Sequence, residues 1–249
     1  MTELQSWWEY DQLESGEPYD WSPASRGEKP WDQEDFHLDL GCGRVKKARI
    51  GVDHKYSPGV DLLIDFEECG PPADMPTEGA GYAIAEQTYQ TYEAEARRRD
   101  ERDGLEPGTH LPFGFLPFPD DSIESVISHH ALEHVGDGFM QVMDEVHRIL
   151  KPGGLFRIIV PAFPSAAAVA DPTHKRYFLA GSWVTWTGHP EGPKYTDGFA
   201  EPYTSATFIL EDQDMSPYPM IDGTPFVDIP KLWGPEGSRE FRIAYRKHE

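Results

Sequence analysis

The sequence has few of the features that mark membrane or secreted proteins. Its 249 residues include only two cysteines, Cys42 and Cys69, which are too few for a disulfide framework and fit reduced thiols. No apolar run approaches the roughly 20 residues that span a bilayer. The first residues, MTELQSWWEYDQLE, lack the basic and apolar segments of a secretory signal. We therefore expect a cytoplasmic protein with no membrane contact.

Positive charge is also scarce. Lysine and arginine number 22 against 44 acidic residues, which gives a net charge of −22, and only nine of the basic residues are lysine. A surface this acidic repels phosphate backbones, which argues against simple electrostatic binding of nucleic acid. Because salt screens the self-repulsion of such a surface, the composition favours a halophilic protein. An ordinary acidic protein with acidic tails is the alternative.

Residues 1–35 differ from the rest of the chain. They hold ten acidic and two basic residues, and no helical or strand periodicity is sustained. We predict an irregular N-terminal extension before a single domain at 36–249. Because large apolar rings are poorly placed in a free tail, we expect part of the extension to dock on the core or, alternatively, to form a lid over a substrate. The rings are those of Trp7, Trp8, Trp21 and Trp31.

Apolar segments that end in turns recur from residue 36 onward. One helix is predicted among them at 139–150, where apolar residues follow helical spacing. Strands that alternate with helices predict an α/β fold with a doubly wound, mostly parallel sheet. Two C-terminal segments, AEPYTSATFILEDQDM and SREFRIAYRKHE, fit an antiparallel hairpin at the sheet edge. The predicted strands are 36–40, 48–53, 60–65, 123–128 and 155–161.

The strand pattern is interrupted between residues 70 and 112. This stretch holds a loop and then a run rich in helix-forming residues, at 82–104. We interpret 70–112 as an insertion with one polar helix, and we favour a solvated surface helix over a functional arm.

Three successive strand ends carry residues suited to a nucleotide. The segment LDLGCG at 38–43 ends a strand in a turn whose two glycines allow close backbone approach to a ligand. Asp53 closes the next strand, where a carboxylate can accept hydrogen bonds from ribose hydroxyls. Asp65 and Phe66 close the third strand and suit an adenine. Each feature alone also fits a structural turn or cap.

Four motifs in this order resemble those of class I S-adenosylmethionine-dependent methyltransferases, and they are most similar to the methyltransferase type 11 group. They are LDLGCG, GVD at 51–53, LPFPDDSIESVISHHALEHV at 116–135 and DEVHRILKPGGLFRIIVP at 144–161. A fifth string, DPTHKRYF at 171–178, is similar to a motif of a subgroup with short first crossovers. The resemblance implies S-adenosylmethionine as cofactor and a Rossmann-like, seven-stranded sheet whose last strand is antiparallel.

The resemblance also implies a cofactor site, residue by residue, and places substrate-facing loops at 162–200. The implied cofactor residues are Asp39, Gly41, Cys42 and Gly43 at the methionine part, Asp53 with the neighbouring His54 at the ribose, Asp65 and Phe66 at the adenine, and Ser128 and His129 at the methyl side.

Two departures from related folds stand out. A dinucleotide fingerprint has a third glycine, but Lys46 stands at that position, which disfavours nicotinamide binding. Only residues 44–47 link the first two strands, too few for the usual crossover helix between parallel neighbours. We expect a shortened first crossover and a locally bare sheet face, covered by the helix at 82–103 or by the N-terminal extension.

Histidines after the fourth strand are candidates for a general base, because histidine titrates near neutral pH. We assign His129 to the cofactor and interpret His134 as a residue that caps or packs against the following helix. His130 is then the predicted base at this strand end, and His174 in DPTHKRYF is the second predicted catalytic residue.

The DPTHKRYF string gathers polar side chains that fit an anionic substrate or a proton relay. A loop stabilised by Asp–Arg pairing is the alternative. We predict that the substrate is bound by Asp171, His174, Lys175 and Arg176.

His130 and His134 also spell H-x-x-E-H, a string found in inverted zinc peptidases. No third ligand is evident, and the methyltransferase resemblance explains the same residues within a longer match, so we predict no metal site. The [DNS]-P-P-[YF] string of amino-group DNA methyltransferases is replaced by SHHA. This again argues against DNA as the substrate.

We therefore expect a methyltransferase that acts on a small-molecule or sugar-like acceptor. One alternative is a non-catalytic, cofactor-binding subunit that engages a protein partner through its tryptophan-rich tail or the 70–112 insertion. Another is an enzyme that transfers a different group from a nucleoside cofactor.

Overall fold

The computed structural model of the protein describes residues 37–44, 46–111, 114–179, 182–185, 204, 206–215 and 240–248. The N-terminal extension predicted at 1–35 lies outside these ranges. So does the part of the predicted loop region beyond residue 185.

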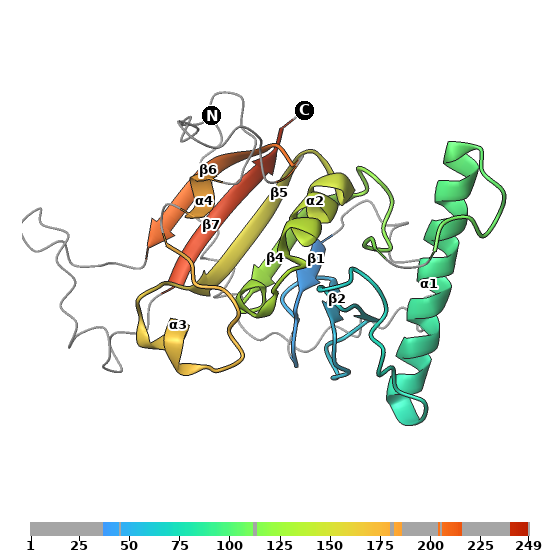
Figure 1. Ribbon diagram of the computed structural model, residues 1–249, viewed down its shortest axis with the longest axis horizontal. Helices are drawn as coiled ribbons and strands as arrows, with labels where there is room; N and C mark the ends of the chain where they lie inside the picture. Colours follow the sequence, from blue (N-terminus) through green and yellow to red (C-terminus); the bar gives the residue numbers. More distant parts are fainter. Residues whose placement is uncertain are drawn as a thin grey trace, which may run out of the picture.

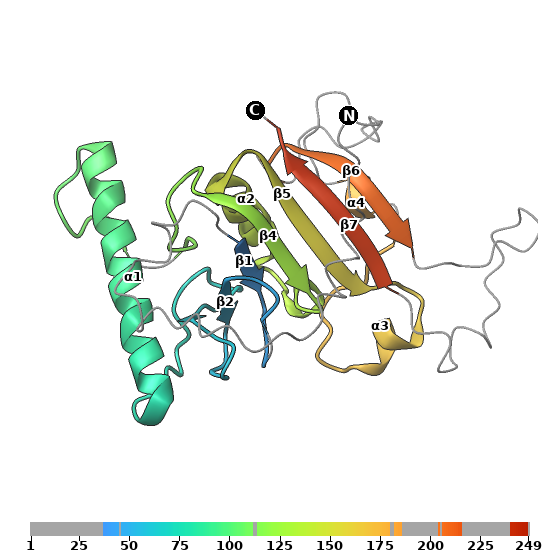
Figure 2. The same cartoon turned by 180° about the vertical axis from the view of Figure 1, so that it is seen from behind.

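Seven strands of the described chain form one sheet, in the order β3-β2-β1-β4-β5-β7-β6 (Figures 1 and 2). The first five strands pair in parallel, whereas β7 runs antiparallel to both β5 and β6. This confirms the predicted Rossmann-like sheet with antiparallel C-terminal strands. The strands are β1 (His37–Leu40), β2 (Ile50–Asp53), β3 (Leu62–Leu63), β4 (Ile123–His129), β5 (Leu150–Pro161), β6 (Phe208–Met215) and β7 (Glu240–Lys247).

Predicted and observed strands differ mainly in their ends. The sequence predicts a strand over 60–65, but β3 spans two residues at the edge of the sheet. Pairing with β2 nevertheless continues on both sides of it. Asp61 N–H donates to Gly51 O at 2.7 Å, and Ile64 N–H donates to Asp53 O at 2.9 Å. β5 is longer than predicted, because it begins directly after the preceding helix.

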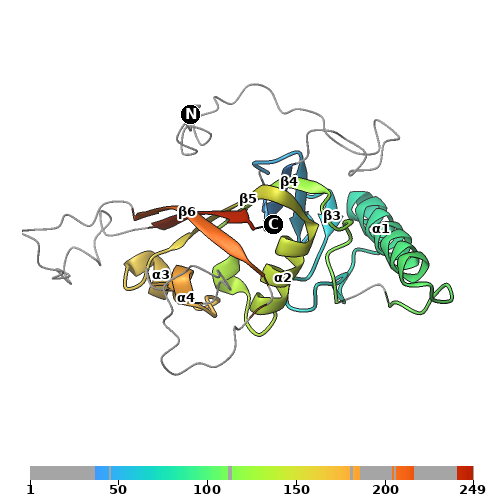
Figure 3. The ribbon, with the colours of Figure 1, turned by 90° about the horizontal axis from the view of Figure 1, so that it is seen from above.

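The helix predicted at 139–150 is α2 (Phe139–Ile149). It lies on the same face of the sheet as the short helices α3 (Ala166–Ala170) and α4 (Ser182–Thr185) (Figure 3). The apolar side of α2 packs on the sheet and forms the main core. Its buried residues are Phe139, Val142, Met143, Val146 and Ile149, and the sheet contributes Leu38, Leu40, Val52, Val126, Phe156 and Ile158.

The inserted helix is α1 (Gly79–Asp103), which stands along the edge strand β3 (Figures 1 and 3). The sequence predicts a solvated helix, but α1 buries one side. Tyr92 is fully buried and packs against Phe115, with ring centroids 5.7 Å apart. Ala85 clusters with Cys42 and Leu63 beside the first crossover. The buried residues recur every three or four positions, a pattern that the many charges around them obscure.

Although α1 is 25 residues long, it is too polar to cross a membrane, and none of the other described helices is long and apolar enough to do so.

The first crossover is short, as predicted, and its described residues form no helix. Asp61 anchors it instead. The carboxylate oxygen Oδ2 of Asp61 accepts hydrogen bonds from Gly51 N–H and from Lys46 Nζ, both at 2.7 Å. Both side chains of this ion pair are largely removed from water, with exposures of 16 % for Lys46 and 7 % for Asp61. Lys46, at the position of the missing third glycine, therefore has a structural partner.

We predict that Asp61→Ala lowers the free energy of unfolding by about 3 kcal/mol, because it leaves a buried ammonium and a buried N–H without their acceptor. Urea denaturation would measure the loss. Glu124→Ala is the matched control, because Glu124 pairs with Lys151 at a similar distance of 2.9 Å but with both side chains about 40 % exposed. Its expected cost is under about 1 kcal/mol. Equal losses in the two variants would contradict the anchoring role of Asp61.

Candidate functional site

The glycine turn after β1 is held by the neighbouring strand. Gly41 N–H and Cys42 N–H both donate to Val52 O, at 2.8 and 3.1 Å, and Gly43 N–H donates to Asp53 Oδ2 at 2.9 Å. Gly41 and Gly43 have φ values of +76° and +58°, which glycine adopts without strain. The turn is thus fixed at the carboxyl ends of β1 and β2, where open α/β sheets bind ligands.

The two glycines of the turn face different surroundings. A Cβ atom on Gly41 would lie 2.2 Å from the Cβ of Ala131, so glycine is needed for the close approach of the segment after β4. A Cβ atom on Gly43 would meet no heavy atom within 4 Å, so open space adjoins it. The thiol of Cys42 contacts the crossover, with Sγ 3.4 Å from Gly59 O, and burial raises its pKa well above the usual range.

Asp39 is a buried carboxylate inside β1, with 1 % of its surface exposed. Its Oδ2 accepts a hydrogen bond from Lys47 N–H at 2.6 Å, whereas Oδ1 has no hydrogen-bond partner in the described part of the chain. Burial raises the pKa of Asp39 to about 6. A buried polar atom without a partner costs free energy, which a ligand carrying an N–H or O–H group would offset.

Asp53 ends β2, and both of its carboxylate oxygens are engaged. Besides the bond from Gly43, Oδ1 accepts a hydrogen bond from Lys55 N–H and contacts His54 Nδ1, both at 3.1 Å. Burial alone would raise the pKa of Asp53, but these hydrogen bonds lower it below the ordinary value. The same contact raises the pKa of His54. Asp53 is therefore ionised at neutral pH and keeps lone pairs for further donors.

The third strand end is more closed. Asp65 Oδ1 accepts a hydrogen bond from Glu67 N–H at 2.9 Å, which stabilises a turn. Phe66 belongs to the main core and is 8 % exposed, and its Cε2 atom would lie 3.9 Å from a Cβ on Gly41. The roles of Asp65 and Phe66 at an adenine stay predictions.

Glu67 is a residue at this end of the sheet that sequence reasoning misses. Its Oε1 accepts a hydrogen bond from Gly136 N–H at 2.6 Å, and its Oε2 accepts one from Gly138 N–H at 3.0 Å. Lys175 Nζ also pairs with Oε1. Glu67 therefore joins the end of β3 to the start of α2 and to the segment after β5. Glu67 and these partners lie far apart in the sequence, so no local sequence pattern predicts the contacts.

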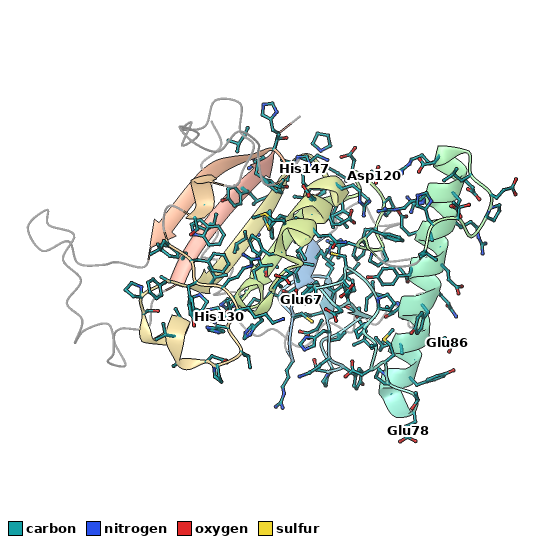
Figure 4. All side chains as sticks on the ribbon, in the orientation of Figure 1. Glu67, Glu78, Glu86, Asp120, His130 and His147 are labelled. Atoms are coloured by element: carbon teal, nitrogen blue, oxygen red, sulfur yellow. The ribbon has the colours of Figure 1, made fainter. Side chains whose placement is uncertain are left out.

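The end of β4 carries three of the predicted residues. Ser128 is fully buried, and its Oγ has no hydrogen-bond partner among the described residues. The rings of His129 and His130 meet edge to face at 4.7 Å. His130 has a φ of +54°, in the left-handed region, and its N–H donates to Ile159 O at 2.9 Å. Its side chain is 39 % exposed and lies at the same end of the sheet as Glu67 (Figure 4).

Two of the predicted substrate-binding cations have partners within the protein. Lys175 pairs with Glu67, and Arg176 Nε donates to Val135 O at 2.9 Å. The guanidinium of Arg176 also lies over the ring of Phe139, 4.5 Å from its centroid. These contacts hold the segment after β5 against the start of α2. Substrate binding by Lys175 and Arg176 stays a prediction.

The structure brings His134 and His174 together beside Glu133. The two imidazole rings meet edge to face, with centroids 4.8 Å apart. His174 Nε2 lies 4.0 Å from Glu133 Oε1, and also 4.0 Å from Asp171 Oδ2. Glu133 itself is 1 % exposed, and burial raises its pKa. The turn after β4 and the DPTHKRYF segment therefore form one polar cluster, which the sequence presents as two separate motifs.

Comparison with known proteins agrees with this architecture. The family model described as "Methyltransferase domain" matches residues 82–158, which run from α1 into β5 and include the LEH string. The matched segment, under a third of the chain, is therefore similar to part of a methyltransferase domain. Together with the sheet order, this match supports a class I S-adenosylmethionine-dependent methyltransferase. The glycine turn and Asp53 precede the matched residues. No curated protein matches the chain.

Solved methyltransferase structures resemble the chain weakly over most of its length. A chain of the complex between the Haloferax volcanii Trm112 methyltransferase activator and the methyltransferase named with it is 16 % identical, with 92 % of this chain and 90 % of that chain covered and a TM-score of 0.45. A SAM-dependent methyltransferase from Archaeoglobus fulgidus is 13 % identical, with 88 % of this chain and 89 % of that chain covered and a TM-score of 0.42. The Burkholderia thailandensis 1,6-didemethyltoxoflavin-N1-methyltransferase is 14 % identical, with 86 % of this chain and 71 % of that chain covered and a TM-score of 0.39. Similarities at this level do not assign an activity.

Replacing Asp39 with asparagine should stabilise the protein at neutral pH. At pH 7.5 the folded state holds a buried, ionised Asp39, which costs about 3 kcal/mol because the carboxyl pKa is raised to about 6. This cost falls as the pH drops through 6, since the folded state then binds the proton more tightly than the unfolded state does.

Urea denaturation of Asp39→Asn should therefore show a gain at pH 7.5 that shrinks by about 1.4 kcal/mol at pH 5. The asparagine carbonyl can still accept the Lys47 N–H, so the hydrogen bond itself is retained. The same gain at both pH values would show that Asp39 is not ionised at a cost in the folded protein.

Proposed function

We propose that the protein is an S-adenosylmethionine-dependent methyltransferase whose cofactor binds at the carboxyl ends of β1, β2 and β4. The observation that carries the proposal is Asp39 Oδ1, a buried acceptor without a donor directly before the glycine turn. Ser128 Oγ is a second unpartnered buried atom, on the neighbouring strand. The glycine turn after β1 has open space beside Gly43. Such a site suits a polar ligand that brings its own donors.

The roles of the chain's residues follow from this geometry. The ionised carboxylate of Asp53 would accept hydrogen bonds from ribose hydroxyls, and Asp39 would accept one from the cofactor's amino acid part. When bound, the cofactor would supply a methyl group on a positively charged sulfur, already activated for in-line displacement. The protein then has to hold acceptor and methyl group in line and keep water out.

We assign proton removal from the acceptor to His130. Its side chain is partly exposed at the end of β4, and its left-handed backbone is uncommon for residues other than glycine. His174, the other predicted catalytic residue, is only 6 % exposed and faces Glu133. The acceptor would be a small molecule or a sugar-like compound bound between His130 and the segment 171–178.

We also propose that the protein works in concentrated salt. The proposal rests on the composition, with twice as many acidic as basic residues. Mutual repulsion of so many carboxylates destabilises a folded chain in dilute buffer, and molar salt screens it. If salt stabilises the folded protein in this way, its affinity for a ligand should be higher in molar salt than in dilute buffer.

Calorimetric titration with S-adenosylhomocysteine tests the cofactor site. We expect micromolar binding, stronger in molar KCl than in dilute buffer. We expect Asp53→Ala to weaken the affinity about 100-fold, because it removes two charged hydrogen bonds to the ribose. Asp120→Ala is the matched control, because Asp120 lies at the opposite end of the sheet (Figure 4). Equal affinity of all three proteins, or no binding at either salt concentration, would refute the cofactor site.

His130→Gly should separate catalysis from binding. Glycine adopts the left-handed backbone freely, so the variant should be as stable as the wild type or more stable by about 1 kcal/mol. Its S-adenosylhomocysteine affinity should be unchanged, whereas methyl transfer to an acceptor that must lose a proton should fall about 10²- to 10⁴-fold.

The outcome also decides between an enzyme and the non-catalytic alternative. Turnover by the wild type across a panel of small-molecule acceptors, read by product mass, supports the enzyme. Cofactor binding without turnover of any acceptor would favour a cofactor-binding subunit with a protein partner. Undiminished turnover by His130→Gly would remove His130 from the mechanism.

A further inference from the structure

Glu133, His134 and His174 offer three potential metal-ligand atoms that all lie within 4.8 Å of one another. Glu133 and His134 belong to the 3-10 helix η3 (Leu132–His134), and His174 comes from the segment after β5. Backbone bonds join these two segments directly. The N–H groups of Lys175 and Arg176 both donate to Glu133 O, at 2.8 and 3.0 Å.

Glu133 is the unusual member of the cluster. It is 1 % exposed, and neither of its carboxylate oxygens has a hydrogen-bond partner in the described part of the chain. His130 Nδ1 and His174 Nε2 lie 3.9 and 4.0 Å from Oε1, beyond hydrogen-bond range. A buried carboxylate so placed is costly unless it pairs with a cation or coordinates one.

The hydrogen bonds of His174 fix the tautomer that a metal requires. Its Nδ1 lies 2.8 Å from Ala168 O. A carbonyl oxygen can only accept, so Nδ1 carries a proton, and Nε2, which faces Glu133, is the nitrogen left for a metal ion. A backbone carbonyl bound to the far nitrogen is the usual outer-shell support of a metal-ligating histidine.

The contacts of His134 lead to the same tautomer. Thr173 Oγ1 donates its proton to Asp171 Oδ1 at 2.6 Å, so it can only accept from His134 Nδ1, 3.0 Å away. Nε2 of His134 is then the nitrogen with a lone pair. Two imidazoles with protonated Nδ1 atoms therefore lie beside a buried carboxylate that has no hydrogen-bond partner. Their Nε2 atoms and the carboxylate oxygens are potential metal ligands.

We propose that Glu133, His134 and His174 bind one divalent transition-metal ion of the zinc class. Two imidazole nitrogens and one carboxylate oxygen are a ligand set that Zn²⁺ prefers in sites with an open position, whereas Mg²⁺ and Ca²⁺ prefer oxygen ligands alone. Ligands of one Zn²⁺ lie about 3.4 Å apart in tetrahedral geometry, so the cluster has to close by about 1.4 Å from its widest separation. The carboxylate of Asp171, 47 % exposed, lies beside the cluster and can supply a further oxygen.

This proposal departs from the sequence-based prediction of no metal site. The string H-x-x-E-H lacks a third ligand within the string, and the structure supplies His174 from after β5. It also changes which histidine of the string is used, because His134 rather than His130 joins Glu133 and His174. An open coordination position would suit an acceptor oxygen; this last step rests on the proposed methyltransferase function, and the ion site itself does not.

Metal binding by the full chain without cofactor or acceptor tests the site. Equilibrium dialysis against Zn²⁺, in excess Mg²⁺ that occupies the acidic surface, should give one bound Zn²⁺ per chain. Glu133→Gln keeps the shape of the side chain and should weaken the affinity at least about 100-fold, as should His174→Gln. His110→Gln is the matched control, because His110 also lies against two carboxylates, Asp100 and Asp103, at 2.8 and 3.6 Å.

The visible spectrum of Co²⁺ bound to the wild-type protein is a second test. It does not depend on whether any variant folds. We expect the intense visible bands of four- or five-coordinate Co²⁺ with nitrogen ligands, lost on addition of equimolar Zn²⁺. No such bands, or the same Zn²⁺ affinity in Glu133→Gln and in the wild type, would overturn the site. Neither result depends on S-adenosylhomocysteine binding, so failure of the metal site and failure of the cofactor site are distinguishable.

Discussion

The ion pair between Asp61 and Lys46 is the constraint on which the connection between β1 and β2 depends. Parallel neighbours normally need a long crossover, usually a helix, and this chain joins β1 to β2 with residues 41–49. One carboxylate oxygen of Asp61 holds both the crossover, through Lys46, and β2, through Gly51 N–H. The glycine turn then closes on the backbone of β2. The geometry around Gly43 therefore rests on a charge pair where related folds use a helix.

Much of the fold is readable from the sequence because its signals are local. The glycine turn, the aspartates at strand ends and the apolar spacing of α2 each lie within about a dozen residues, and the structure has them where predicted. The family resemblance implies seven strands and an antiparallel last strand, and the strand order is seen only in the structure. The buried side of α1 is masked by charges, and β3 is shorter than its apolar run because it is an edge strand.

The polar clusters at the site could not be predicted in the same way. Glu67 contacts Lys175, and Glu133 lies next to His174. The residues of each pair are distant in the sequence and come together only when the sheet folds. The sequence predicts substrate binding by Lys175 because a His-Lys-Arg run in an acidic chain fits an anionic ligand. In the structure the ammonium of Lys175 pairs with Glu67, which anchors the segment after β5. Substrate binding by Lys175 would compete with this ion pair.

Three unfavourable features gather at one end of the sheet: a buried Asp39 with an unpartnered oxygen, a left-handed His130 and a buried, unpartnered Glu133. Each costs stability, and a fold selected for stability alone would have replaced them. Hydrogen bonds hold the backbone of Glu133 in place, since the N–H groups of Lys175 and Arg176 both donate to its carbonyl oxygen. Groups held out of water without partners can bind a ligand with little reorganisation, because the cost of removing them from water has already been met in folding. That reasoning makes this end of the sheet the place where cofactor, acceptor and metal ion would meet.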